Sequence, residues 1–197
     1  MTNLQTLNRV ADDTWTKTNH ESLVNLRELH LFLYRESERM FTFVSIAKLK
    51  SIQILSVDLS DNNFFPALQP LSHCPHLRDL SLSGKIKNLP EDMHVLLPNV
   101  ESLSLRKSKL VDDPMPVLGK MLNLTILELR YDCLRGKKMM CRANTFPRVE
   151  TLDIETHYLE EWQVEEGARP VLTGLELINY SQQFQLPERL KSVARLH

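Results

Sequence analysis

One apolar pattern recurs along the whole chain at a nearly constant spacing. In each copy, apolar residues stand at the first, fourth and sixth positions of a short segment, written L-x-x-L-x-L. Successive copies start 22 to 26 residues apart, and their first apolar residues are Leu4, Leu26, Ile52, Leu77, Val100, Leu124, Val149 and Leu172. A spacing in this range, held over so many copies, indicates a chain that stacks one small structural unit upon itself.

Each copy of the pattern predicts a short β-strand with one buried face. Alternating apolar residues, such as Leu80 and Leu82, point to one side of a strand, and the residues between them point to the other. One copy cannot cover its own apolar face, so neighbouring copies must stack in parallel and share a column of leucines. We therefore predict an α/β fold, a curved leucine-rich-repeat solenoid. Its parallel β-sheet would form the concave face, and irregular or short helical return segments the convex face.

The copies are irregular, and this shapes the expected domain organisation. Arg9 stands where the first copy should have its third apolar residue. The asparagine that usually follows each copy is replaced by other residues, namely Ser60, Lys85, Ser108, Asp132, His157 and Tyr180. We predict a single domain over residues 1–197 with about eight repeats. No polar capping unit is recognisable at either end, and a repeat begins immediately after Met1. We therefore expect this domain to be a C-terminal piece of a longer chain, with a missing neighbour that covers its N-terminal edge.

Composition excludes several classes of protein. The chain has 24 Lys and Arg residues against 25 Asp and Glu residues, so its net charge of -1 gives no reason to expect nucleic-acid binding. The sequence contains neither an apolar run of transmembrane length nor the hydrophobic region of a signal peptide. Its three cysteines, Cys74, Cys133 and Cys141, are odd in number and irregularly spaced, which suits a reducing compartment. We therefore expect a cytoplasmic protein without a transmembrane segment.

The cysteines and histidines do not form a convincing chemical site. The segment His73-Cys74-Pro75-His76 contains zinc-ligand residue types, but it has no second pair at a usable spacing. We predict that it binds no metal, that Cys74 is buried and that both imidazoles are solvated. Cys133 and Cys141 flank a basic segment that would lower the pKa of an exposed thiol, yet no base or cleft can be assigned to them. We predict an ordinary loop there.

The carboxylate pairs also favour a protein without catalytic activity. They are Asp112-Asp113, Glu160-Glu161 and Glu165-Glu166. Adjacent acidic residues outside an apolar pocket are typical of a solvated surface rather than of a tuned acid and base. We therefore predict that the chain is not an enzyme.

Three segments of the C-terminal third carry a family resemblance. They are FPRVETLDI (146–154), LEEWQVEEGARPVLTGLEL (159–177) and QLPERL (185–190). This series closely resembles the last repeats of plant coiled-coil nucleotide-binding leucine-rich-repeat disease-resistance proteins. The resemblance implies a region that senses a pathogen effector, a viral protein, or a host protein modified by one, and triggers defence and the hypersensitive response. It also implies autoinhibition against the receptor's own nucleotide-binding domain, and a cytoplasmic location, free or associated with the plasma membrane.

The nucleotide switch of that family has no counterpart in this sequence. A phosphate-binding loop of the G-x-x-x-x-G-K-[ST] type is absent among only five glycines. We therefore expect no cofactor in this chain, and ADP or ATP only in the nucleotide-binding domain of the full-length family.

The outward-facing strand residues are the candidate protein-binding surface. They are Phe32, Arg106, Lys107, Glu128, Arg130, Tyr131, Asp153, Glu155 and Glu176. Residues 101–142 contain nine Lys and Arg against five Asp and Glu, whereas residues 149–168 contain seven Asp and Glu and no Lys or Arg. We expect an electrically divided concave face that selects its partner by charge. The alternative, that these charges only keep a repeat sheet soluble, stays open.

A second function is compatible with the same repeats. A substrate-binding leucine-rich-repeat region of an F-box-type ubiquitin-ligase adaptor would also bind proteins through an intracellular solenoid. An F-box preceding this segment would favour the adaptor, and a nucleotide-binding region would favour the immune receptor.

Overall fold

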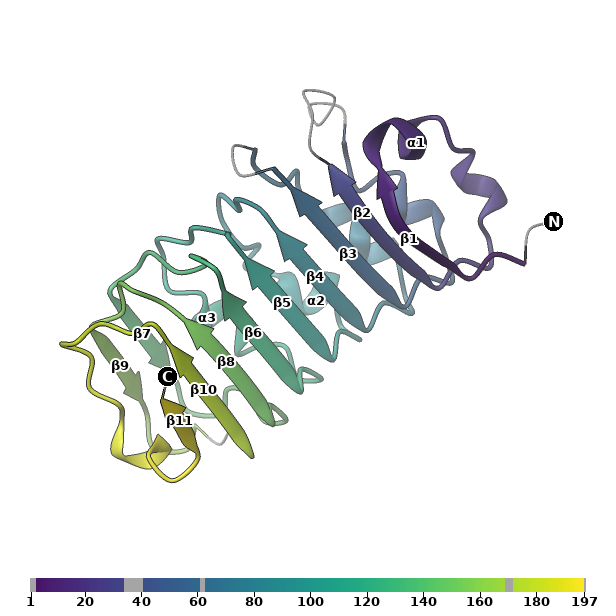
Figure 1. Cartoon of the computed structure of the whole chain (residues 1–197). Coiled ribbons are helices and arrows are strands. Elements are labelled where there is room, and N and C mark those ends of the chain that lie inside the picture. Colours follow the sequence, from purple (N-terminus) through teal and green to yellow (C-terminus); the bar gives the residue numbers. More distant parts are fainter. Residues whose placement is uncertain (1–2, 34–40, 61–62, 169–171, 197) are drawn as a thin grey trace.

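A computed structural model describes residues 3–33, 41–60, 63–168 and 172–196. In this part of the chain, nine strands form one parallel sheet in the order β1-β2-β3-β4-β5-β6-β8-β10-β11 (Figure 1). These strands are β1 (Thr6–Ala11), β2 (Glu28–Leu33), β3 (Ile54–Leu59), β4 (Asp79–Ser83), β5 (Ser102–Arg106), β6 (Ile126–Arg130), β8 (Thr151–Glu155), β10 (Gly174–Ile178) and β11 (Ala194–Leu196). Each coil of the chain contributes one strand, which confirms the predicted solenoid.

The buried leucines line up across neighbouring coils as predicted. Leu80 pairs with Leu103, Leu103 with Leu127, and Leu127 with Leu152. All four side chains are at most 5% exposed. Burying one leucine stabilises the fold by about 1.5–3 kcal/mol, so this column and the parallel column through Leu82, Leu105 and Leu129 form the continuous core.

Short helices cover one side of the sheet in most coils. They are α1 (Asp12–Thr16), η1 (His20–Ser22), η3 (Ile46–Lys48), η4 (Gln69–His73), α2 (Met93–Leu96), α3 (Met115–Leu118) and η5 (Glu188–Leu190). None exceeds five residues in the described part of the chain, because a return segment has only enough length for about one helical turn between strands. The other side of the sheet, which we call the open face, lacks this cover (Figure 1).

Two late return segments are strands rather than helices or irregular turns. β7 (Lys138–Cys141) pairs in parallel with β9 (Glu161–Val164) (Figure 1). The prediction of an ordinary loop ending at Cys141 is therefore wrong. Met139 and Cys141 are buried while Lys138 is exposed, and this period of two is typical of a strand. The indole Nε1 of buried Trp162 lies 3.4 Å from Cys141 Sγ and joins the two strands.

A β-bulge in β1 changes which residue of the first coil is buried. Arg9 has a φ of 55°, and the pairing between β1 and β2 shifts between Leu7 and Val10. Val10, not Arg9, therefore pairs with Leu31 and enters the core at 8% exposure. An extra residue of this kind turns the following side chains to the opposite face of a strand.

Turns of different length also move the buried position that follows two later strands. Asp132 has a φ of 64°, and Cys133 rather than Asp132 is fully buried beside Ser108. In the next coil Thr156 is 2% exposed and His157 is exposed. The residues that replace the usual asparagine are thus Ser108, Cys133 and Thr156 in these coils, and the assignments to Asp132 and His157 were wrong.

Candidate functional site

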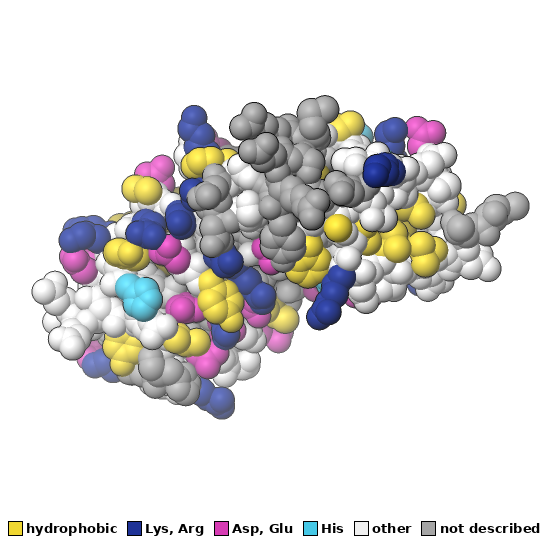
Figure 2. All heavy atoms as spheres, turned by 45° about the horizontal axis from the view of Figure 1, so that its top comes forward, with side chains coloured by type: hydrophobic (Ala, Val, Ile, Leu, Met, Phe, Trp, Pro, Cys, Tyr) yellow, Lys and Arg dark blue, Asp and Glu magenta, His cyan; other side chains and the backbone are white. Residues whose placement is uncertain are grey.

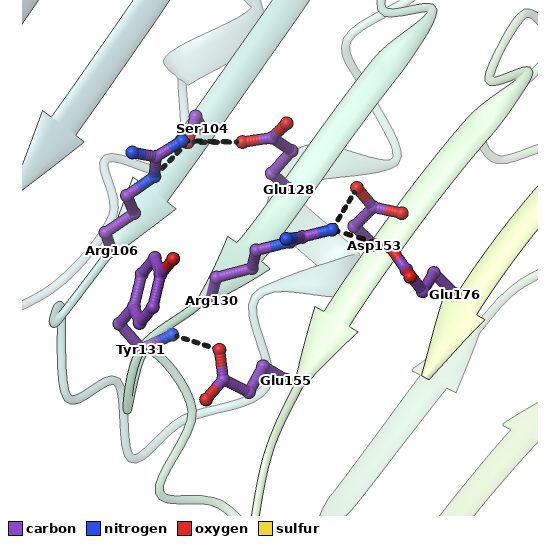
Figure 3. A network of polar contacts seen from close by, with 8 residues as sticks. All are labelled: Ser104, Arg106, Glu128, Arg130, Tyr131, Asp153, Glu155 and Glu176. Carbon is purple, nitrogen blue, oxygen red and sulfur yellow. Dashed lines mark hydrogen bonds and ion pairs between the residues drawn. The ribbon is translucent and has the colours of Figure 1, made fainter. Parts of the chain in front are cut away.

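The open face gathers most of the predicted binding residues in one place. Arg106 lies on β5, Glu128 and Arg130 on β6, Asp153 and Glu155 on β8, and Glu176 on β10 (Figure 3). Tyr131 follows β6, and Lys107 follows β5, where its backbone N–H donates to the carbonyls of Arg130 and Tyr131. Phe32 lies apart on β2, three strands from β5 in the sheet order. Eight of the nine predicted residues therefore form one cluster, which we call the ion-pair network.

Arg130 is the centre of the ion-pair network. Its Nη2 donates to Asp153 Oδ2 at 2.8 Å and to Glu176 Oε2 at 2.7 Å, so one side chain ties three neighbouring coils together (Figure 3). Burial alone would lower the pKa of Arg130, but the surrounding carboxylates, Asp153 first, raise it above its ordinary value. The pKa of Asp153 is also raised, first by burial, despite the attraction of Arg130 and with further repulsion from Glu176 and Glu128. One guanidinium is thus surrounded by the carboxylates of Asp153, Glu176 and Glu128.

Arg106 begins a second branch of the network. Its Nε donates to Ser104 Oγ at 3.1 Å, and its Nη2 lies 3.2 Å from Glu128 Oε2. Ser104 in turn donates to the same carboxylate oxygen at 2.9 Å (Figure 3). Ser104 was not among the predicted binding residues, although its place between Leu103 and Leu105 is the outward position of a strand.

The third branch holds the turn that follows β6. The backbone N–H of Tyr131 donates to Glu155 Oε2 at 3.2 Å, and Asn179 Nδ2 donates to the other oxygen of Glu155 at 3.2 Å. The guanidinium of Arg106 lies 5.8 Å from the centre of the Tyr131 ring, within the range of a cation–π contact. Tyr131 has a φ of 53°, and the acceptor at its amide stabilises this left-handed conformation.

The predicted division of charge is replaced by an interleaved arrangement. Basic residues of β5 and β6 are bonded to acidic residues of the next coils, so neither sign forms a separate field on the open face. Figure 2 shows dark blue and magenta side chains interspersed over the C-terminal half of the molecule, whereas hydrophobic side chains gather toward the N-terminal end. The charge counts of sequence segments did not predict this interleaving, because strands that are far apart in the sequence lie side by side in the sheet.

A row of serines continues the open face toward the N-terminus. Ser56 pairs with Ser81, and Ser81 pairs with Ser104. These small hydroxyl side chains form a floor, which we call the serine floor, over β3, β4 and β5. Its signal in the sequence is the repeated Leu-Ser-Leu of residues 80–82 and 103–105.

One predicted solvated carboxylate proves to be structural. Asp113 is half-buried, and its two oxygens accept from the backbone N–H groups of Met115 at 2.9 Å and Met140 at 2.8 Å. Burial raises the pKa of Asp113, although these hydrogen bonds oppose the shift. Asp113 therefore connects the start of α3 with β7 rather than lying on a free surface. Glu161, by contrast, is paired with Lys138 at 2.7 Å, as expected for a surface residue.

The cysteines are enclosed by the core. Burial raises the pKa of Cys74 to about 11, of Cys133 to about 12 and of Cys141 to about 11, so all three thiols are protonated near neutral pH. His73 and His76 are exposed and Cys74 is buried, as predicted. Over the described ranges, no group of His, Cys, Asp or Glu side chains has an arrangement that could hold a metal ion.

The described helices are short, and none of them is long and apolar enough to cross a membrane.

The whole chain is similar to known proteins. Residues 1–195 match the family described as leucine-rich repeat region. In Arabidopsis thaliana, a disease resistance RPP13-like protein is 32% identical over 96% of this chain and 23% of its own length. Disease resistance RPP8-like protein 3 is 38% identical over 61% of this chain and 13% of its own length. Disease resistance protein RPP8 is 30% identical over 93% of this chain and 23% of its own length. The chain thus spans less than a quarter of the length of these relatives.

Proposed function

This chain belongs to the leucine-rich repeat region family of plant disease resistance proteins, and on that premise we propose that it is the recognition region of an immune receptor. It would bind a pathogen effector, a viral protein or a host protein modified by one, and thereby release defence and the hypersensitive response. The observation that carries this proposal is the ion-pair network on the open face, in a chain that matches the family over residues 1–195.

The ion-pair network supports protein recognition by its rigidity. Arg130 is held by two carboxylates from successive coils, so its position is set before a partner arrives. Preorganised side chains lose less conformational entropy on binding than free ones do. Arginine and tyrosine are also enriched among the residues that dominate binding energy, and Arg106 lies over Tyr131 in this network.

We further propose that the same region holds the receptor inactive by contact with its nucleotide-binding domain. A partner that binds the active state better than the inactive state would then shift the equilibrium between them. ADP or ATP would be bound only by that other domain, and this region would supply binding without catalysis. The receptor would act in the cytoplasm. The relatives named above favour this function over that of a ubiquitin-ligase adaptor.

A co-purification experiment tests the proposal. The nucleotide-binding domain of the full-length receptor would be co-expressed with this chain as a separate polypeptide, and the amount captured would be measured. We expect capture by the wild-type chain and a loss of about tenfold with Arg130→Glu, because one reversed charge breaks two ion pairs and opposes three carboxylates. Lys120→Glu, on an exposed lysine just after α3, is the matched control and should change nothing.

A functional readout completes this test. Co-expression of the full-length receptor with candidate pathogen proteins in leaves should give cell death for a cognate protein, and Arg130→Glu should alter that response. If the chain captured neither the nucleotide-binding domain nor any protein that triggers the receptor, the proposed function would be wrong.

A further inference from the structure

Three exposed aromatic rings at one edge of the molecule are each covered by a basic side chain. Lys85 Nζ lies 5.7 Å from the centre of the Phe64 ring, and Arg135 Cζ lies 4.7 Å from that of Tyr158. Arg106 and Tyr131 form the third pair. Phe64 is 60% exposed, Tyr131 51% and Tyr158 37%. We call these three pairs the basic–aromatic edge.

The three pairs lie on successive coils, where the strands end. Phe65 donates its backbone N–H to Lys85 O at 2.8 Å, and Lys109 donates to Asp132 O at 3.2 Å. Arg135 Nη1 donates to the hydroxyl of Tyr158 at 2.8 Å. Backbone and side-chain bonds thus connect the coils from Phe64 to Tyr158.

The edge carries positive charge that its neighbours do not neutralise. Among the described residues, no ion pair joins Lys85, Lys87 or Lys109 to a carboxylate. Arg106 is paired with Glu128, and Arg135 with Asp132, so two guanidiniums are held in place while three ammonium groups stay available.

Acidic residues lie near the edge. The open face beside it carries Asp153 and Glu155, which belong to the ion-pair network. Lys87 lines a groove together with Glu91, Asp112 and Asp113. Within the described part of the chain, the lysines that form no ion pair are therefore carried by successive coils, with acidic residues close by.

We propose that the basic–aromatic edge binds a protein segment rich in Asp and Glu that lies along this edge. Carboxylates of the segment would be attracted to the three available lysines, and the exposed rings would pack against its aliphatic parts. The inference rests on the proposed function, because it names the chemistry of one protein partner.

The same features argue for an acidic protein segment over a nucleic acid. Bases bind to protein by stacking on open aromatic faces. Here each ring already has an ammonium or guanidinium group over it, so a base that stacked on that face would have to displace the cation.

Fluorescence anisotropy with a labelled peptide of alternating Asp and Ser residues tests the inference on the whole chain. We expect binding that weakens as salt is added, because exposed charges are screened beyond a distance of about 10 Å at 0.1 M salt. A Lys-Ser peptide of the same length should not bind. The double variant Lys85→Glu/Lys109→Glu should reduce affinity by about tenfold or more, since it removes two attractions and adds two repulsions.

Two further variants separate a local effect from a general one. Lys120→Glu changes an exposed lysine outside the edge and should leave affinity unchanged. Tyr131→Ala should reduce affinity by a few fold without changing the charge. Circular dichroism of each variant verifies that the fold is kept.

The outcomes distinguish this inference from the proposed function. If the acidic peptide failed to bind, or bound equally to the double lysine variant, the inference would be overturned. Capture of the nucleotide-binding domain, and its loss with Arg130→Glu, would still support the proposed function. If a single-stranded oligonucleotide bound more tightly than the peptide and depended on the same lysines, the edge would be a nucleic-acid site and the inference would also fail.

Discussion

Over β3, β4 and β5 one outward row of the sheet consists of Ser56, Ser81 and Ser104, whereas over β6, β8 and β10 the same row holds Glu128, Asp153 and Glu176. The two buried rows beside it hardly change, because leucine follows leucine through all of these strands except at Ile154 on β8 and Val57 on β3. The serine floor and the ion-pair network are thus two different surfaces on one repeated backbone.

The difference shows which residues carry stability and which are free to carry recognition. The buried row must fit the neighbouring coils, and therefore it is nearly uniform. The outward row contacts only its lateral neighbours and solvent, and thus it can change from hydroxyls to charges without altering the fold. Recognition by this chain would then depend on where along the solenoid a partner lies.

The largest effect should come from the buried row, and it should be equal in both regions. Leu80→Ala, under the serine floor, and Leu152→Ala, under the ion-pair network, should each lower the free energy of unfolding by about 2–5 kcal/mol, because both leave a cavity in one column. Urea unfolding followed by circular dichroism measures this. A cost at Leu152 far below that at Leu80 would mean that the core weakens toward the C-terminus.

The next effect should distinguish the two arginines of the network. Arg130→Ala should cost about 1–3 kcal/mol, because it leaves the carboxylates of Asp153 and Glu176 close together and partly buried. Arg106→Ala should cost less than about 1 kcal/mol, because its side chain is 41% exposed and solvent screens its ion pair. Equal losses in urea unfolding would contradict the central role of Arg130.

Alkaline pH should weaken the region under the network more than the region under the serine floor. Burial raises the pKa of Cys74, Cys133 and Cys141 above the ordinary value of 9.0, so the folded chain keeps these protons longer than the unfolded chain does. The stability present below pH 9 is therefore lost as pH rises through the raised pKa values, by at most about 1.4 kcal/mol per thiol per pH unit.

Cysteine variants show how much of this loss comes from each region. Urea unfolding would be measured between pH 8 and pH 10.5, about the range in which an ordinary thiol titrates. The free energy of unfolding should fall less steeply with pH in the double variant Cys133→Ala/Cys141→Ala than in Cys74→Ala. An unchanged pH dependence in the double variant would show that the two thiols do not contribute.

The smallest effect should lie at the boundary between the two surfaces. Ser104→Ala should cost about 1 kcal/mol, because Ser104 is bonded to both Arg106 and Glu128. Ser81→Ala, in the same row but one coil earlier, should change stability by less than about 0.5 kcal/mol. If both changes were neutral in thermal unfolding, the network would not extend to β5.

The sequence predicts which face of the sheet several site residues lie on, but not which of them form ion pairs. The outward positions of Arg106, Glu128, Arg130, Asp153 and Glu176 follow from alternation within each strand. Their pairing does not, because Arg130 reaches Asp153 and Glu176 across 23 and 46 residues of sequence. Ser104 and Asn179 were missed for the same reason, since each matters only through a partner on another coil.

The sequence by itself determined the stacking period, the buried leucine columns and, in the regular strands, the side of the sheet on which each residue lies. These properties depend on hydrophobic spacing that is read within one copy of the repeat. Tertiary structure alone decided the bulge that buries Val10, the pairing of β7 with β9, the burial of Cys133 and the interleaving of charge on the open face. The physical reason is that turn lengths set the register between coils, and this register determines which side chains from distant parts of the chain meet.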